Sequence, residues 1–169
     1  MATHGTVGAA LAASADASAP DAGVRHLCAV HEALRSALRA NINRRPILSS
    51  GQAVADYLMV TIGHRRTERI QVLFLDAANH LIADETMSSG TTDAAAIYPR
   101  EVIHRALELG ATALILAHNH PSGDPRPSPQ DVAVTRSLGN AGQALSIAVH
   151  DHIIVSPGGC FSMRAEGLL

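Results

Sequence analysis

The sequence predicts one domain of the α/β or α+β class, built on a mixed β-sheet that is flanked by helices. Segments with helical periodicity alternate with short apolar, β-branched segments along the chain, and two of the latter form an apparent hairpin. A length of 169 residues is sufficient for one domain with its own core and a small appendage. Two cysteines are too few for a disulfide scaffold, so the core must come from apolar packing.

The N-terminal part is predicted to be a tail followed by a helix. Residues 1–24 are rich in Ala, Ser, Gly and Thr, which cannot offset the entropy cost of ordering, so we expect disorder there. The absence of Lys and Arg from this stretch argues against a secretion signal. Residues 25–45 predict a helix that Pro46 ends, with one apolar stripe formed by Leu27, Val30, Leu34 and Leu38.

The domain proper, residues 46–169, is expected to begin with a helix and a hairpin. Residues 50–62 predict the helix, with Gly63 as its C-cap. The run 68–76 predicts a strand, and a turn leads to a second strand from Leu81 to about Met87. A loop over residues 88–92 follows.

The second half predicts further helices and strands. Pro99 opens a helix that Gly110 closes, and residues 113–117 form an apolar run typical of a buried central strand. After a proline-rich loop, the next helix starts at Ser128 and extends to about residue 141. Two strands, 145–149 and 152–155, are expected on either side of Asp151, and a last strand from about residue 161.

Composition excludes several classes of function. The net charge of −2 argues against a basic nucleic-acid clamp, and two Tyr and two Phe leave little for base stacking. No apolar run approaches the ~20 residues of a membrane helix, so we expect no membrane association and a cytoplasmic location. Ten histidines against two cysteines indicate that any metal ligands would be imidazole and carboxylate groups.

One constellation has the pattern of a metal site. His118 and His120 follow the apolar strand two residues apart, so their side chains point to the same side. Asp131, in the first turn of the next helix, can supply a third ligand. Two histidines and one carboxylate leave a position at zinc open for water, and imidazole ligands favour zinc over magnesium.

Each fragment also has a simpler interpretation. A His-x-His pair is more often a pair of surface or capping histidines than a metal site. The segment from Ser128 to Asp131 is in itself a good helix start, and Asp124 suits an ordinary turn. What favours a metal site is the combination of an apolar strand that delivers two histidines, a rigid proline-rich loop and a helix start that carries a carboxylate. The capping and ligand roles do not exclude each other.

The spacing His118-x-His120, seven residues, Ser128, two residues, Asp131 resembles the metal motif of the JAB/MPN (JAMM) metallopeptidases. The fuller run HNHPSGDPRPSPQD, with segments 99–101 and 151–154, is similar to the RadC-like branch. The resemblance covers about residues 46–169, and 25–45 is similar to the segment that precedes the domain in that branch. It implies a mixed sheet flanked by helices, layered as in cytidine deaminases.

The resemblance also implies site residues and a reaction. His118, His120 and Asp131 would bind Zn²⁺, and Ser128 would stabilise the oxyanion of a tetrahedral intermediate. The family places its general base, a glutamate, at the start of the strand after the first helix, and Glu68 matches by position; Glu85 and Glu101 are rivals. The implied activity is hydrolysis of a peptide or isopeptide bond in a peptide or protein substrate.

The alternative is a non-catalytic, DNA-repair-associated accessory module. The complete ligand set favours the enzyme. Longer RadC-like proteins carry a helix-hairpin-helix module, and no such pattern is visible before residue 46, so DNA association is possible but not supported by charge. Near the site, Asp151 could orient the imidazole of His152, or the two could be a turn aspartate and an ordinary buried histidine. The substrate and the oligomeric state are not indicated by the sequence.

Overall fold

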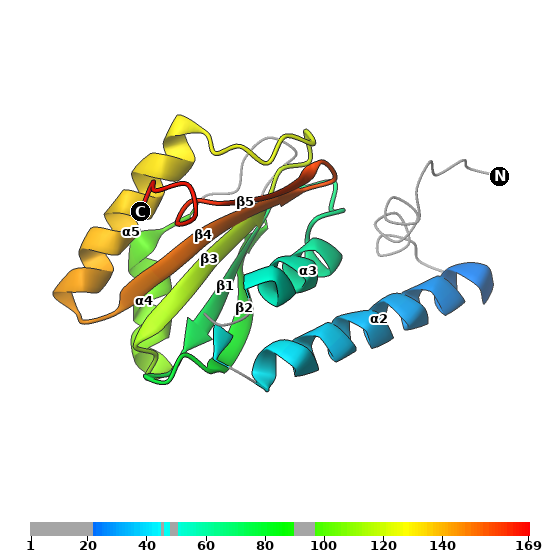
Figure 1. Cartoon of the computed structure of the whole chain (residues 1–169), viewed down its shortest axis with the longest axis horizontal. Coiled ribbons are helices and arrows are strands. Elements are labelled where there is room, and N and C mark those ends of the chain that lie inside the picture. The colour runs from blue at the N-terminus through cyan, green and yellow to red at the C-terminus, as the bar shows by residue number, and fades with distance from the viewer. Residues whose placement is uncertain (1–21, 45, 48–50, 90–96) are drawn as a thin grey trace.

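A computed structural model describes residues 22–44, 46–47, 51–89 and 97–169 of the chain. It contains one five-stranded sheet in the order β2-β1-β3-β4-β5, with α4 and α5 on one face and α3 and part of α2 on the other (Figure 1). The predicted mixed sheet flanked by helices is confirmed. In chain order the elements are α2 (Ala22–Asn43), α3 (Gly51–Thr61), β1 (Arg69–Leu75), β2 (Leu81–Ser89), α4 (Pro99–Glu108), β3 (Ala113–Asn119), α5 (Pro129–Ala144), β4 (Ala148–Ser156) and β5 (Gly159–Ser162).

The sheet is mixed because only β3 and β4 run parallel, and α5 connects them as a crossover. The other neighbouring pairs, β1 with β2, β1 with β3 and β4 with β5, are antiparallel. β3 lies at the centre, and all seven of its residues are buried, as the apolar run predicts. In register, Ile70 of β1 pairs with His118 of β3, and Leu116 of β3 pairs with His152 of β4.

Strand alternation divides the core into two layers. Side chains of the α4/α5 layer include Ile70, Val72, Leu114, Leu116 and Leu138. The α3 layer takes the alternate strand positions and includes Leu73, Ile115, Ala117, Ile153 and Val155. Because side chains two residues apart share a face, His118 and His152 both belong to the α4/α5 face.

The N-terminal helix differs from the sequence expectation. It begins at Ala22, so the last three residues of the expected tail are helical; residues 1–21, which carry the rest of that prediction, lie outside the described residues. Its apolar stripe is mostly uncovered: Leu27, Val30 and Leu34 are 37%, 64% and 48% exposed. Only the C-terminal part reaches the core, where Ile42 is fully buried. The periodicity of the sequence identified the apolar face of α2, but it does not indicate whether another part of the protein covers that face.

Other boundaries also shift. Residue 50, the expected start of the second helix, lies outside the described residues. Most of the loop expected over 88–92 also lies outside them, but Ser88, its first residue, belongs to β2. β3 extends through Asn119, and α5 ends at Ala144 rather than near 141. No helix among the described residues is both long and apolar enough to cross a membrane.

The expected break at Asp151 is wrong: β4 is one continuous strand, and Leu145 caps α5 rather than starting a strand. The pairing with β3 shifts register between Val149 and Asp151, so His150 is an extra residue in the ladder. Such a bulge reverses the alternation of side chains along the strand, which is why the pattern resembles two separate strands.

Candidate metal centre

His118 reaches the centre from the end of the central strand. It is 1% exposed and projects to the α4/α5 face. Its Nε2 lies 2.8 Å from Nε2 of His120, and its Nδ1 lies 2.8 Å from Nε2 of His152. Both ring nitrogens therefore have imidazole neighbours, one on the same strand end and one on β4.

His120 lies just beyond β3 and is held by the loop that follows. Its backbone N–H donates to the carbonyl of Val155 at 2.9 Å, and its Nδ1 donates to the carbonyl of Asp124 at 2.8 Å. A carbonyl can only accept, so Nδ1 of His120 carries the proton. When the ring is neutral, its Nε2, which faces His118, presents a lone pair.

Asp131 enters from the start of α5, where Pro129 occupies the first turn. Ser128 and Asp131 form a capping box: the Ser128 hydroxyl accepts from the Asp131 backbone N–H at 3.2 Å, and the carboxylate accepts from the Ser128 N–H at 2.8 Å. Asp131 Oδ1 lies 3.4 Å from Nε2 of His118, and Oδ2 lies 3.6 Å from Nε2 of His120. The helix cap therefore also aims a carboxylate at both imidazoles.

The donor set suits a cation. One donor atom each from His118, His120 and Asp131 lies within 4.8 Å of the others, and no other group of three such side chains with this proximity occurs in the described part of the chain. Two imidazole nitrogens 2.8 Å apart beside a carboxylate need positive charge between them, which a shared proton or a metal ion supplies. Two nitrogens and one carboxylate oxygen fit zinc, which prefers such ligands.

Burial and charge bias these groups toward metal-binding forms. Burial lowers the pKa of His118 to about 4, so its imidazole is neutral at neutral pH. Burial alone would raise the pKa of Asp131, but contact with His120 and His118 and the hydrogen bonds from Ser128 hold it well below its usual range. The Asp131 contact raises the pKa of His120. An ionised carboxylate beside a neutral buried imidazole is a ready ligand pair.

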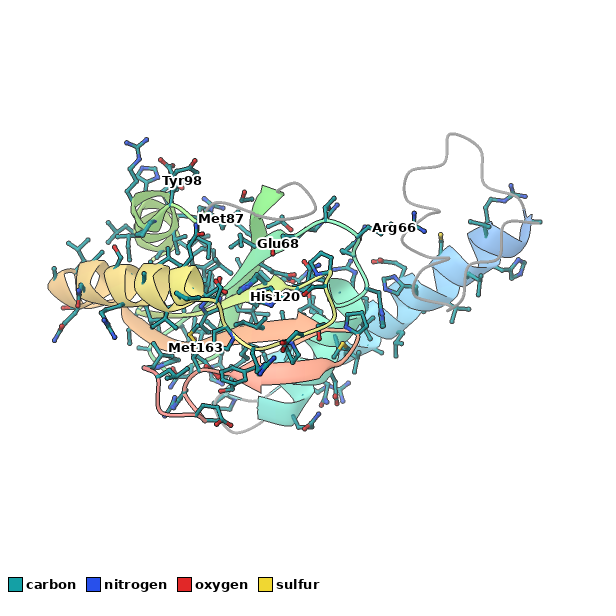
Figure 2. All side chains as sticks on the ribbon, turned by 90° about the horizontal axis from the view of Figure 1, so that it is seen from above. Arg66, Glu68, Met87, Tyr98, His120 and Met163 are labelled. Atoms are coloured by element: carbon teal, nitrogen blue, oxygen red, sulfur yellow. The ribbon has the colours of Figure 1, made fainter. Side chains whose placement is uncertain are left out.

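Glu68 lies close enough to His120 for its charge to help raise the pKa of that imidazole. Glu68 immediately precedes β1 and lies two residues before Ile70. Because side chains two residues apart along a strand share a face, Glu68 lies on the same face as Ile70. His118 pairs with Ile70 across the antiparallel strands and lies on that face as well. Glu68 and His120 both lie near the middle of the molecule in Figure 2. The rival glutamates pair elsewhere, Glu85 with Arg105 and Glu101 with Arg100.

Two residues near the centre, Asn119 and Thr135, have roles that sequence reasoning missed. Asn119 binds the segment around Glu68, and Thr135 bonds the ring of His152 at 2.5 Å. Asp151 does not orient the His152 ring: its carboxylate accepts from Ser162 Oγ and from backbone N–H groups. The strand alternation around His152 was a usable signal, but the bulge before it obscured the pattern.

Ser128 lies in the helix cap next to Asp131. Its hydroxyl donates to Asp131 Oδ2 at 2.6 Å while it caps α5. In this arrangement the hydroxyl proton is directed at the carboxylate of Asp131.

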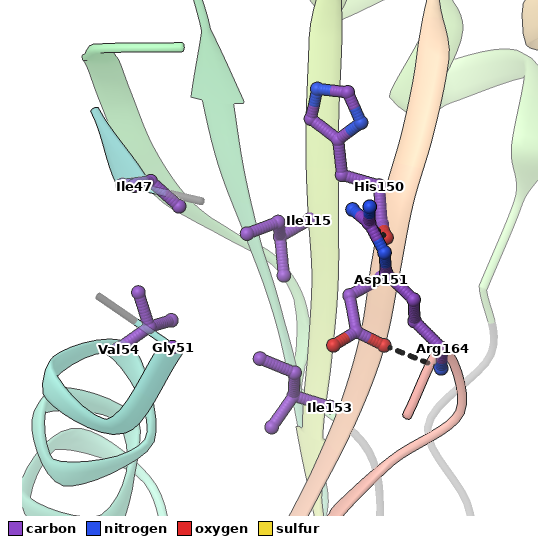
Figure 3. A pocket seen from close by; sticks show the side chains of 8 residues that line it. All are labelled: Ile47, Gly51, Val54, Ile115, His150, Asp151, Ile153 and Arg164. Carbon is purple, nitrogen blue, oxygen red and sulfur yellow. Dashed lines mark hydrogen bonds between the residues drawn. The ribbon is translucent and has the colours of Figure 1, made fainter. Parts of the chain in front are cut away.

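A hollow of about 280 Å³ lies on the opposite face of the sheet (Figure 3). Ile115, Ile153 and Val54 line it together with His150 and Asp151, and the Asp151 carboxylate is bonded to the backbone N–H of Arg164. Ile115 and Ile153 belong to the α3 layer, so the hollow is separated from the His118 face by the sheet.

Comparison with known proteins identifies the family of the chain. Residues 48–168 match the model of the RadC-like JAB domain. The chain is 50% identical over 149 residues to a UPF0758 protein of Rhodobacter capsulatus, a match that covers 88% of the chain and 70% of that protein. It is also 50% identical over 131 residues to a UPF0758 protein of Ruegeria pomeroyi, covering 78% and 58% respectively, so the chain spans less than two thirds of that relative. The names of these relatives state no reaction. The chain belongs to the RadC-like JAB domain family.

Proposed function

We propose that this protein is a zinc-dependent hydrolase of peptide or isopeptide bonds. The convergence of His118, His120 and Asp131 donor atoms within 4.8 Å carries the proposal. Three protein ligands leave one position for water or substrate, which is the arrangement of catalytic rather than structural zinc sites. Zinc bound there would supply a water of lowered pKa and polarise the scissile carbonyl.

The chain's own residues account for the proton transfers and charge stabilisation of amide hydrolysis. The Glu68 carboxylate takes a proton from the attacking water and delivers it to the leaving amine, so that one water and one amide give a carboxylic acid and an amine. The Ser128 hydroxyl donates to the oxyanion after releasing Asp131 Oδ2, its acceptor in the resting arrangement. The proximity of Glu68 and His120 supports this assignment of the base.

Metal content is the first test. Protein purified without added metal should carry about one zinc per chain, and His118→Ala or Asp131→Ala should carry none. The matched control is His104→Ala, because that side chain is 70% exposed on α4. Absence of zinc from the wild type, even after reconstitution with zinc salts, would overturn the proposal and favour the non-catalytic accessory module.

Hydrolysis is the second test. The zinc-loaded protein is incubated with a peptide library and with isopeptide-linked peptide pairs, and new amines are detected. Glu68→Gln should retain zinc and lose at least ~10²-fold in rate, which is the usual contribution of a general base. Glu101→Gln, a change at an exposed residue paired with Arg100, is the control. Undiminished cleavage by Glu68→Gln would remove Glu68 from the mechanism.

A further inference from the structure

A buried chain of hydrogen bonds connects α5 to the centre through β4. The Thr135 hydroxyl lies 2.6 Å from the Asp131 carbonyl and 2.5 Å from Nδ1 of His152, and Nε2 of His152 lies 2.8 Å from Nδ1 of His118. Thr135, His152 and His118 are 2%, 0% and 1% exposed. Water therefore has little access to this chain, and each group must find its partner within it.

The direction of each hydrogen bond in this chain follows from the acceptor at its end, the Asp131 carbonyl. The Asp131 carbonyl only accepts, so the single Thr135 proton goes to it. Toward His152 the Thr135 oxygen must then accept, and Nδ1 of His152 carries a proton. A neutral imidazole has one N–H, so Nε2 of His152 is an acceptor.

The same reasoning fixes the tautomer of His118. Since Nε2 of His152 accepts, Nδ1 of His118 must donate, and Nε2 of His118 is left with its lone pair. That lone pair faces His120 and Asp131. His120 reaches the same tautomer by a different route, through the Asp124 carbonyl. Both imidazoles thus present Nε2 toward one point.

We propose that Thr135 and His152 are positioning residues that hold His118 as its Nδ1–H tautomer and so reserve its Nε2 for metal. This rests on the proposed function. Partners of metal-bound histidines are commonly carboxylates or carbonyls, which can only accept. An imidazole partner can donate or accept, so its own tautomer must be set, and the Thr135 hydroxyl sets it. Thr135 thereby affects the metal through two imidazoles without contacting it.

The alternative is that Thr135 and His152 have a purely structural role, which is common for buried residues of these types. Helical threonines often bond the carbonyl four residues back, and a buried histidine needs two partners. Thr61 of α3 provides a matched case, since its hydroxyl donates to the Tyr57 carbonyl at 2.7 Å. A structural role predicts the same result for Thr61→Val and Thr135→Val, whereas the positioning role predicts a difference in tautomer and metal affinity.

The test combines tautomers in metal-free protein with zinc affinity. Long-range ¹H–¹⁵N spectra should show the Nδ1–H tautomer at both His118 and His152 in the wild type. In Thr135→Val the Nε2–H form should appear at both, and Thr135→Ser should restore the wild-type spectrum. Zinc affinity, measured by competition with a chelator, should fall about 10–100-fold in Thr135→Val and be unchanged in Thr61→Val.

The outcomes separate this inference from the proposed function. An Nε2–H tautomer at His118 in the metal-free wild type would overturn the inference, and this holds even if Thr135→Val fails to fold. The inference would also be overturned if Thr135→Val gave the same tautomer spectra and the same zinc affinity as the wild-type protein. Absence of zinc binding by the wild type would refute the metal centre, while the metal-free spectra would still decide the tautomers.

Discussion

The side-chain oxygen of Asn119 accepts a hydrogen bond of 2.8 Å from the backbone N–H of Arg69, the residue after Glu68. The amide nitrogen of the same side chain donates to the carbonyls of Thr67 and Arg65, both at 3.2 Å. One fully buried side chain, placed between His118 and His120 in sequence, thus holds the backbone on both sides of Glu68. The end of β3 therefore connects the proposed ligands to the proposed base.

Asn119→Ala should loosen this segment without removing zinc. The Arg69 N–H loses its acceptor, so its hydrogen exchange should accelerate, while the ligands keep their own bonds. Hydrogen exchange and zinc content measured on the same sample check this. Asn140→Ala, a change at an exposed residue of α5, is the control. Unchanged exchange at Arg69 would show that the segment is held by other contacts.

Asp84 should be a major contributor to stability. Its nearly buried carboxylate accepts from the Tyr57 hydroxyl, pairs with Arg39 at 2.6 Å and accepts from Gln71 at 3.2 Å, joining β2 to α3, α2 and β1. Asp84→Ala leaves the buried Tyr57 hydroxyl without its acceptor, so we expect a loss of about 2–3 kcal/mol in the free energy of unfolding.

Urea unfolding measures this change. Asp56→Ala is the comparison, because Asp56 is exposed and pairs with Gln52 on the same helix as Tyr57. It should change stability by less than ~0.5 kcal/mol. Equal effects of the two substitutions would show that the buried network contributes little.

The ion pair between Glu85 and Arg105 should make stability depend on pH. Two hydrogen bonds of 2.7 and 2.8 Å from Arg105 hold the pKa of Glu85 below its ordinary value of 4.5. The stabilisation is therefore complete above pH 4.5 and is lost as the pH falls through the lowered pKa. Because both side chains are about one third exposed, it should not exceed ~1 kcal/mol.

Unfolding of the wild type and of Glu85→Gln in urea at neutral and acidic pH tests this prediction. The difference between the two proteins should be largest at neutral pH and should narrow below pH 4.5. A difference that stays constant over the whole range would contradict the role of the ionised carboxylate.

Two glycines of α5 should respond in opposite directions to alanine. A Cβ at Gly142 would lie 2.4 Å from the Ile147 carbonyl oxygen, a backbone atom that cannot yield cheaply, whereas a Cβ at Gly139 meets nothing within 4 Å. Gly142→Ala should destabilise by about 1–3 kcal/mol through overpacking. Gly139→Ala should stabilise by up to ~1 kcal/mol, because alanine is the better helix former. Urea unfolding curves of both variants check the signs.

The convergence of His118, His120 and Asp131 could be predicted from sequence because its determinants are local. The two-residue spacing of His118 and His120, and the helix start that contains Ser128 and Asp131, need no tertiary information. The position of Glu68 depends on β1 pairing antiparallel with β3, which the hairpin pattern does not specify. The contact of His152 with His118 spans 34 residues and follows a bulge that disrupts the alternation. The position of Glu68 and the contact of His152 with His118 therefore depend on pairing between distant strands, which periodicity along the sequence does not predict.

The central place of β3 has a consequence for how the proposed metal centre would respond to heating. Both edges of β3 are paired and all of its residues are buried, so it belongs to the part of the fold that opens only with global unfolding. His118 lies on that strand, and Asn119 holds the segment that carries Glu68. Local fraying at the termini would leave this arrangement intact. Loss of zinc from the proposed centre on heating should therefore coincide with cooperative melting of the sheet.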